Sequence, residues 1–210
     1  MKSKIIVVLI LVLTLSIGFA TLSNQLKIDL DSKVNPNPES FAVVFSSSES
    51  EVSTNDIIPT KIGDFTASSA TISNGDIPTV KDISIEFNEA SQEVQYVFYV
   101  HNTGKYDAYL NAVEFQNASG ESKFKKCTAI SGTSQSVVDS ICDDITLTLS
   151  IGDLNISDSD DNINEHVLTQ TNNETVTLTI KYNSSANTSS LDGDFIVEFG
   201  TISLKYQSVD

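Results

Sequence analysis

The sequence predicts an all-β protein, an antiparallel two-sheet sandwich of about eight to nine strands. Many short segments alternate apolar residues with Thr, Ser, Gln or Lys, which is the period of a half-buried strand. No long stretch has helical periodicity, and turn residues separate the alternating segments. Hydrophobic residues make up 40% of the 210-residue chain. They fall in short clusters, so the chain can bury one sizeable core.

Two segments show the alternation most clearly, Val176–Tyr182 and Ile145–Ile151. Six others show it more loosely: Leu26–Leu30, Phe41–Phe45, Ile83–Phe87, Val94–Val100, Tyr109–Phe115 and Phe195–Tyr206. This number of strands suits a two-sheet sandwich of jelly-roll-like type. Asn74-Gly75-Asp76 and the segment 191–194 are tight-turn signals, whereas 32–40, 46–60 and 154–174 are predicted loops.

The last predicted strand changes phase at Gly200. Two apolar sets of opposite parity flank this glycine, Phe195, Val197 and Phe199 before it and Ile202, Leu204 and Tyr206 after it. Side chains alternate between the two faces of a strand, so an unbroken strand would expose one of the sets. We therefore predict a β-bulge at Gly200 that brings both sets to the core.

The N-terminus has the features of an export signal. Lys2 and Lys4 precede an apolar run, 5–20, that is shorter than the roughly 20 residues needed to cross a bilayer comfortably. The run ends in small residues two apart, Gly18 and Ala20, as a signal peptidase requires. The sequence predicts a cleaved signal peptide, 1–20, or alternatively an uncleaved anchor helix. A strand and Pro-containing linker, 21–39, and a sandwich domain, 40–210, follow.

The charge of the chain limits the kinds of partner that it can bind. The net charge is −16, all 12 basic residues are Lys, and loss of Lys2 and Lys4 with the leader would bring it to −18. Arginine supplies the bidentate contacts that bind phosphates and read guanine. Its absence and the negative field argue against nucleic acid, and against a membrane contact other than through the N-terminal segment. A secreted or extracellular cell-surface protein of a bacterium is predicted.

The chain has two cysteines, Cys127 and Cys142. An even number in an exported protein favours one disulfide, which would close a loop of about 15 residues and stabilise the fold by about 3 kcal/mol. Two buried free thiols are the alternative.

No residue pattern indicates an enzyme or a cofactor. The two histidines, His101 and His166, lie in no metalloprotease motif, and nucleophile-elbow and phosphate-loop motifs are absent from the sequence. We expect each histidine either to have hydrogen-bond partners within the fold or to lie at the surface. The acidic segment with Asp158, Asp160 and Asp161 is a weak calcium candidate, since it lacks the turning glycine and the bidentate glutamate. A solvated loop is the default, and no metal is predicted.

Two further features are expected to have no functional role. Lysines cluster beside the first cysteine, at Lys123, Lys125 and Lys126, and we interpret them as a locally balanced surface. Five Asn-x-Ser/Thr sequons occur, at Asn117, Asn155, Asn173, Asn183 and Asn187. In a chain this rich in Asn, Ser and Thr they are expected by chance.

The first strand after the leader is the candidate functional element. Leu22, Leu26, Ile28 and Leu30 lie within about ten residues of the predicted cleavage point. Such a strand can pair within its own sandwich or insert into the groove of a neighbouring copy. Cleavage would then free the strand and control assembly.

Three stretches resemble the TasA/camelysin-like family of exported bacterial proteins. They are the leader ending at 17–20 and the alternating segment after it, the stretch Val94–Gly104 with 107–110, and the closing pair 174–182 and 191–206. The resemblance implies a jelly-roll sandwich, export through a SipW-type signal peptidase, and a role as an extracellular fibre or matrix subunit. The cysteine pair departs from that family's pattern.

We therefore expect a secreted or cell-surface structural protein, a subunit of an extracellular fibre or biofilm-type matrix that assembles by strand exchange. Its partners would be further copies of itself or other matrix proteins. The alternative is a monomeric surface domain, held by an uncleaved anchor, that binds a carbohydrate or a protein through its loops. The cheapest discriminator between the two is the N-terminus of the native protein.

Overall fold

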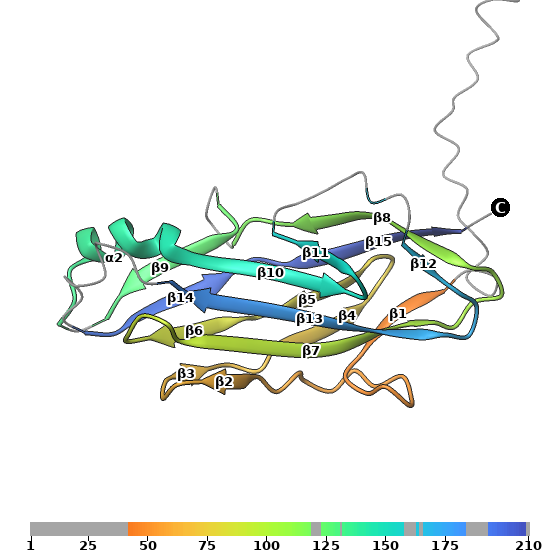
Figure 1. Cartoon of the computed structure of the whole chain (residues 1–210), viewed down its shortest axis with the longest axis horizontal. Helices are drawn as coiled ribbons and strands as arrows, with labels where there is room; N and C mark the ends of the chain where they lie inside the picture. Colours follow the sequence, from red (N-terminus) through yellow and green to blue (C-terminus); the bar gives the residue numbers. More distant parts are fainter. Residues whose placement is uncertain are drawn as a thin grey trace, which may run out of the picture. The chain divides into compact units, whose positions relative to one another are not determined.

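The computed structural model describes residues 42–118, 123–130, 132–157, 163, 166–183 and 193–208. The chain divides into two units, Met1–Asn35 and Pro36–Asp210, and all described residues belong to the second. This unit is an antiparallel β-sandwich, so the predicted fold class is confirmed at this level (Figure 1). Its described part contains fifteen strands and a seven-residue helix.

The first layer is one sheet in the order β1-β7-β13-β10-β11, with β2 also paired to β7. Its strands are β1 Val43–Ser46, β2 Thr60–Ile62, β7 Glu93–Asn102, β10 Ile145–Ile151, β11 Leu154–Ile156 and β13 Asn173–Tyr182. The two long strands at its centre, β7 and β13, pair over nine residues from Asn173 opposite His101 to Lys181 opposite Glu93.

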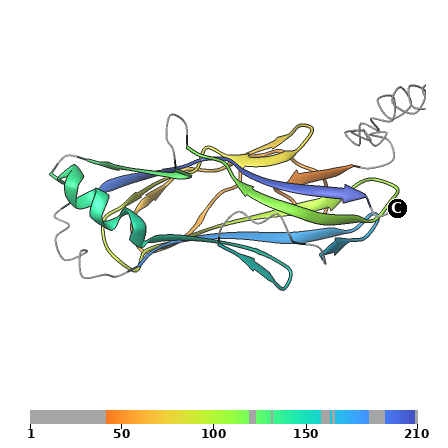
Figure 2. The same cartoon turned by 90° about the horizontal axis from the view of Figure 1, so that it is seen from above.

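The second layer consists of two short sheets that follow one another along the sandwich. One has the order β12-β8-β15-β5-β4 and the other β3-β6-β14-β9. Their strands are β3 Thr66–Ala67, β4 Thr71–Asn74, β5 Pro78–Lys81, β6 Ser84–Phe87, β8 Ala108–Phe115, β9 Lys125–Ala129, β12 Val167–Leu168, β14 Phe195–Phe199 and β15 Ile202–Ser208. Both layers are visible from above in Figure 2.

Gly200 joins the two short sheets. Before it Phe195, Val197 and Phe199 are buried, and after it Ile202 and Leu204 are buried as well, as the prediction requires. The chain is not merely bulged here: β14 ends at Phe199, and β15 begins at Ile202 in the other sheet. Backbone bonds from the Gly200 N–H to the Phe124 carbonyl and from the Gln116 N–H to the Thr201 carbonyl bridge the break. A true register shift lies further on, between Lys205 and Tyr206.

The core fills the space between the layers. The inward positions of the long strands are fully buried, and an aromatic cluster occupies one end of the sandwich. In that cluster the Phe87 ring lies 5.8 Å from Tyr182 and 6.0 Å from Phe195, and Tyr182 meets Phe195 edge-on at 5.3 Å. These separations are in the favourable range for aromatic pairs, which add stabilisation beyond their buried area.

Local sequence explains two connections. The β10–β11 hairpin turns on Gly152 and Asp153, with a positive φ of 54° at the glycine alone, the pattern of a type II′ turn. The Asn74-Gly75-Asp76 signal forms the β4–β5 hairpin as predicted. Its Asn74 amide also donates to the Phe45 carbonyl and accepts from the Phe45 N–H, both at 2.8 Å, which ties this turn to β1.

The helix and some short strands differ from the sequence-based expectation. Helix α2, Gln135–Ile141, continues into a 3₁₀ turn, η1 Cys142–Asp144, in a stretch for which we predicted no element. Seven residues are too few to give a clear helical period, and α2 is held by burial of Val138 and Ile141. The predicted loop 154–174 contains β11 and β12, which are too short to show alternation.

Candidate strand-binding slot

A hollow lies between the layers at one side of the sandwich. There β9, the edge strand of one short sheet, faces the first half of β10, an edge of the other layer (Figures 1 and 2). A hollow of about 780 Å³ lies here, lined by residues 115 and 123–125, by residues 145–148 of β10 and by Ser157, Asn183 and Phe199. We call this hollow the β9–β10 slot.

The hydrogen-bond alternation shows which backbone groups of β10 face the slot. The Asn183 N–H donates to the Asp144 carbonyl, so the backbone N–H and C=O groups of residues 144, 146, 148 and 150 point toward β13. The backbone groups on the opposite edge, which point away from β13, are those of Ile145, Leu147, Leu149 and Ile151. The last two of these pair with β11, which stops opposite Leu149. No described strand pairs with residues 145–148 on this side, a stretch about 13 Å long at the rise of a β-strand, and its outward backbone groups belong to Ile145 and Leu147.

The floor of the slot is apolar. The Phe124 ring lies 5.1 Å from Phe115 and 5.7 Å from Phe199, so three phenylalanines form a row from the β8 end across to β14. Phe115, Phe124 and Leu147 are only partly buried although they pack against the core. Burial of exposed apolar surface here would be favourable at about 25 cal/mol per Å². The slot thus combines an unpaired strand edge with an incompletely covered apolar floor.

Lys125 crosses the slot. Its side chain extends from β9, and its ammonium donates to the Ile145 carbonyl of β10 at 2.6 Å. Burial lowers the pKa of Lys125, and the nearby Asp143 carboxylate partly opposes that shift. The predicted lysine cluster is therefore only partly a solvated surface. Lys123 is exposed and Lys126 lies opposite Glu198 in the β9–β14 pair, whereas Lys125 is a half-buried structural contact.

The β9 edge next to the slot, at residues 127–129, is covered by the segment that follows it. Gln135, the first residue of α2, accepts from the Ala129 N–H at 2.9 Å and donates to the Cys127 carbonyl at 3.0 Å. A strand added to β9 would pair with this N–H and this carbonyl. The Gln135 side chain therefore takes the hydrogen bonds that a neighbouring strand would make. Cys127 and Cys142 form the predicted disulfide, with their Cα atoms 6.0 Å apart, and tie the far end of α2 to the same edge.

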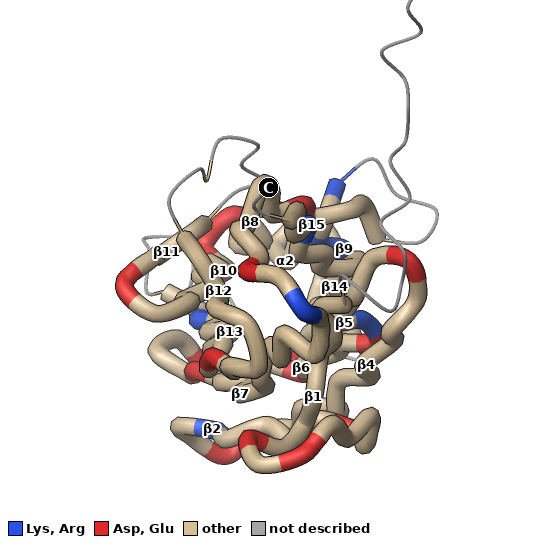
Figure 3. The backbone as a smooth tube through the Cα atoms, turned by 90° about the vertical axis from the view of Figure 1, so that its right-hand side faces the viewer, with Lys and Arg blue, Asp and Glu red and all other residues tan. Residues whose placement is uncertain are grey.

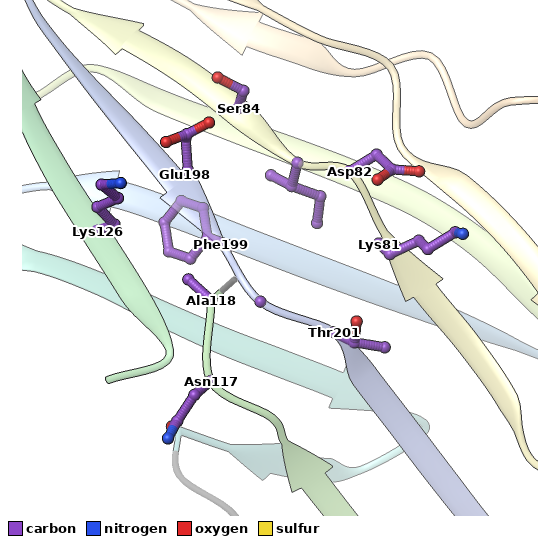
Figure 4. Close-up of a pocket in the computed structure, with 11 residues that line it drawn as sticks. Lys81, Asp82, Ser84, Asn117, Ala118, Lys126, Glu198, Phe199 and Thr201 are labelled. Atoms are coloured by element: carbon purple, nitrogen blue, oxygen red, sulfur yellow. The ribbon is translucent and has the colours of Figure 1, made fainter. Parts of the chain in front are cut away.

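A second hollow, of about 590 Å³, lies on the outer surface at the break between the two short sheets (Figure 4). Lys81 and Asp82 lie on one side of it and Lys126 and Glu198 on the other, over a floor that includes Phe199. The two ammonium groups and two carboxylates cancel, so the hollow has no charge preference. The strand β14, which borders this hollow, is paired on both sides.

Both histidines have partners. His101 is buried and its Nε2 lies 2.9 Å from the Ser48 carbonyl, while His166 contacts the Glu174 carboxylate. The contact of His101 is to the main-chain oxygen of Ser48 and not to its hydroxyl, and the contact of His166 is to a carboxylate. The prediction that the chain is not an enzyme stays a prediction.

Several predicted site residues lie outside the described part of the chain. They are the cleavage residues Gly18 and Ala20, the strand-exchange candidates Leu22, Leu26, Ile28 and Leu30, and the calcium candidates Asp158, Asp160 and Asp161. Four sequon asparagines are described, and three of them make side-chain bonds. Asn155 accepts from Ser150, Asn173 donates to the Glu49 carbonyl, and Asn183 donates to the Asp144 carbonyl.

Acidic residues are spread over the turns and strand ends of the described unit rather than gathered at one point (Figure 3). Within the described ranges no group of three or more His, Cys, Asp or Glu side chains could hold a metal ion. Among the helices that the structure describes, none is long and apolar enough to cross a membrane. Comparison with known proteins gives no match to a family model, to a curated protein or to a solved structure.

Proposed function

We propose that this protein is a secreted, non-enzymatic structural subunit that assembles into an extracellular fibre or matrix by strand exchange. The observation that carries the proposal is the β9–β10 slot, where the Leu147 N–H and carbonyl on the outward edge of β10 have no partner in the described part of the chain and lie beside a partly uncovered row of phenylalanines. An added strand would complete the backbone pairing and bury that row in one step.

The proposed occupant is the segment Leu22–Leu30 of another copy. Its most regular part, Leu26–Leu30, alternates apolar residues with Lys27 and Asp29 and is about 17 Å long as a strand. It is therefore one residue longer than the edge at 145–148. The alternation would direct three apolar side chains to the floor and leave the two charged side chains on the opposite face of the added strand.

The strand order supports a finer classification of the fold. If β5 with β6, β8 with β9 and β14 with β15 are each counted as one strand, and the short strands β1 to β4 are set aside, the remaining strands have the orders β7-β13-β10-β11 and β5-β15-β8-β12. In this order the eight strands follow the chain path of two Greek keys wound into a jelly roll. We propose that classification, and it agrees with the fold implied by the TasA/camelysin-like resemblance.

Electron microscopy of the protein purified from the culture medium tests the function. Filaments are expected at neutral or mildly acidic pH. Mildly acidic pH should favour them, because the repulsion within the acidic chain is weaker there than at neutral pH. Deletion of residues 22–30, or Ile28→Asp alone, should abolish them, because the slot loses its apolar partner. Lys27→Ser is the matched control, since it alters a position on the opposite face of the same strand and should leave filaments intact. Filaments of normal length from the deletion variant would refute the proposal.

A further inference from the structure

The two edges of the slot are not equivalent. On β9 the outward Cys127 carbonyl and Ala129 N–H are already bonded to the Gln135 side chain, and the disulfide holds the end of α2 beside them. On β10 the Ile145 N–H bonds to the Cys142 carbonyl. The alternation leaves the Leu147 N–H and carbonyl directed into the slot, with no partner in the described part of the chain.

One group on the accepting edge is occupied by a side chain that can leave. The Ile145 carbonyl, which an incoming strand would use, accepts from the Lys125 ammonium instead. That ammonium sits on a flexible four-carbon stem, and rotation about the stem takes it to solvent. The contact also joins the two layers across the slot, so an incoming strand must displace it.

Resting on the function proposed above, we infer that Lys125 is the gate of the slot and that strands add to β10 and not to β9. Entry requires the Lys125–Ile145 bond to break, after which the backbone of the incoming strand takes the Ile145 carbonyl. The released ammonium can then pair with a carboxylate of the incoming segment, Asp29 or Asp31, so the cognate segment offsets the lost bond. A segment without those carboxylates leaves the ammonium with solvent only.

The test compares Lys125→Met with Lys126→Met in the full chain. Methionine keeps a long apolar stem over the phenylalanines but cannot donate, whereas Lys126 is the neighbour on the opposite face of β9. The probe is a fluorescent synthetic peptide of residues 22–31, whose association rate and affinity are measured by anisotropy. A hydrogen bond to a charged group is worth at least about tenfold in an equilibrium constant. Lys125→Met should therefore accelerate association about tenfold, and Lys126→Met less than twofold.

The outcomes separate the gate from the function. Equal rates for Lys125→Met and the unaltered chain, with clear peptide binding in both, overturn the gate and leave strand exchange standing. Peptide binding to none of the three proteins overturns both. Amide exchange identifies the accepting edge independently of the rates: the peptide should protect Leu147 and leave Ala129 unchanged, and protection of Ala129 instead would show that β9 accepts the strand. Circular dichroism confirms that each variant is folded.

Discussion

The fold should tolerate substitution of Gly200 poorly. A Cβ atom added there would lie 1.9 Å from the Gln116 carbonyl oxygen, 2.7 Å from the Asn117 carbonyl carbon and 2.8 Å from the Ala118 nitrogen. Ordinary van der Waals contact begins near 3.4 Å. All three atoms are backbone, and the hydrogen bonds that bridge the two short sheets hold them in place. Gly200→Ala must therefore displace a whole segment rather than a side chain.

The cost can be bounded from known overpacking effects. Forced insertion of a methyl group into a packed site typically costs 1–3 kcal/mol, and the backbone clash puts this site at about 3 kcal/mol or above. For a chain of this length each kcal/mol lowers the melting temperature by about 2–4 °C, so a fall of at least about 6–12 °C is expected. Thermal unfolding followed by circular dichroism measures it.

Gly75→Ala is the matched control. No atom lies within 4 Å of a Cβ added at Gly75, and its φ is not in the left-handed region, so the melting temperature should change by less than about 2 °C. If Gly200→Ala melts within about 2 °C of the unaltered protein, the close approach at the sheet break does not exist and the description of the second layer is wrong.

Three further predictions concern the disulfide and the buried tyrosines. Replacement of both cysteines by serine should lower the free energy of unfolding by about 3 kcal/mol in a denaturant titration, and a reductant should have no further effect. Tyr206→Phe should leave stability unchanged or slightly raised, because its buried hydroxyl has no hydrogen-bond partner among the described residues. Tyr96→Phe removes a 2.8 Å bond to the Ser68 carbonyl and should cost about 1 kcal/mol. Burial, with a smaller effect from Asp144, raises the pKa of Tyr182 to about 12. Between about pH 10 and pH 12 the folded chain keeps a proton that the unfolded chain loses, so stability should fall as pH rises, less steeply in Tyr182→Phe. A melting temperature independent of pH in that window would contradict the last prediction.

The parts of the fold that the sequence predicted are those in which one face of a long strand is buried. Ile145–Ile151 is a strand over the predicted residues, and Val176–Tyr182 lies within the longer β13. Both alternate without interruption, because they lie in a sheet with one face on the core and one in solvent. The phase change at Gly200 was also predictable, since two apolar sets of opposite parity can both be buried only if the strand is interrupted between them.

The slot could not be predicted in the same way. It depends on where β11 stops pairing with β10, and a three-residue strand leaves no periodic signal. Gln135 and Lys125 act through contacts with backbone groups of another strand, and no spacing in the sequence marks such contacts. The lysine cluster was visible as composition, but a solvated surface and a half-buried crossing side chain have the same sequence. Only the cysteine pair pointed to this side of the molecule in advance.

The central claim is that the edge of β10 accepts a strand, and the exchange rate of the Leu147 amide tests it most directly. Hydrogen–deuterium exchange should be compared between dispersed and assembled protein, with the Thr148 amide, already bonded to β13, as the internal reference. If the account is correct, assembly slows exchange at Leu147 at least tenfold and leaves Thr148 unchanged. If Leu147 exchanges as fast in the assembled protein as in the dispersed one, the slot is not where the subunits join.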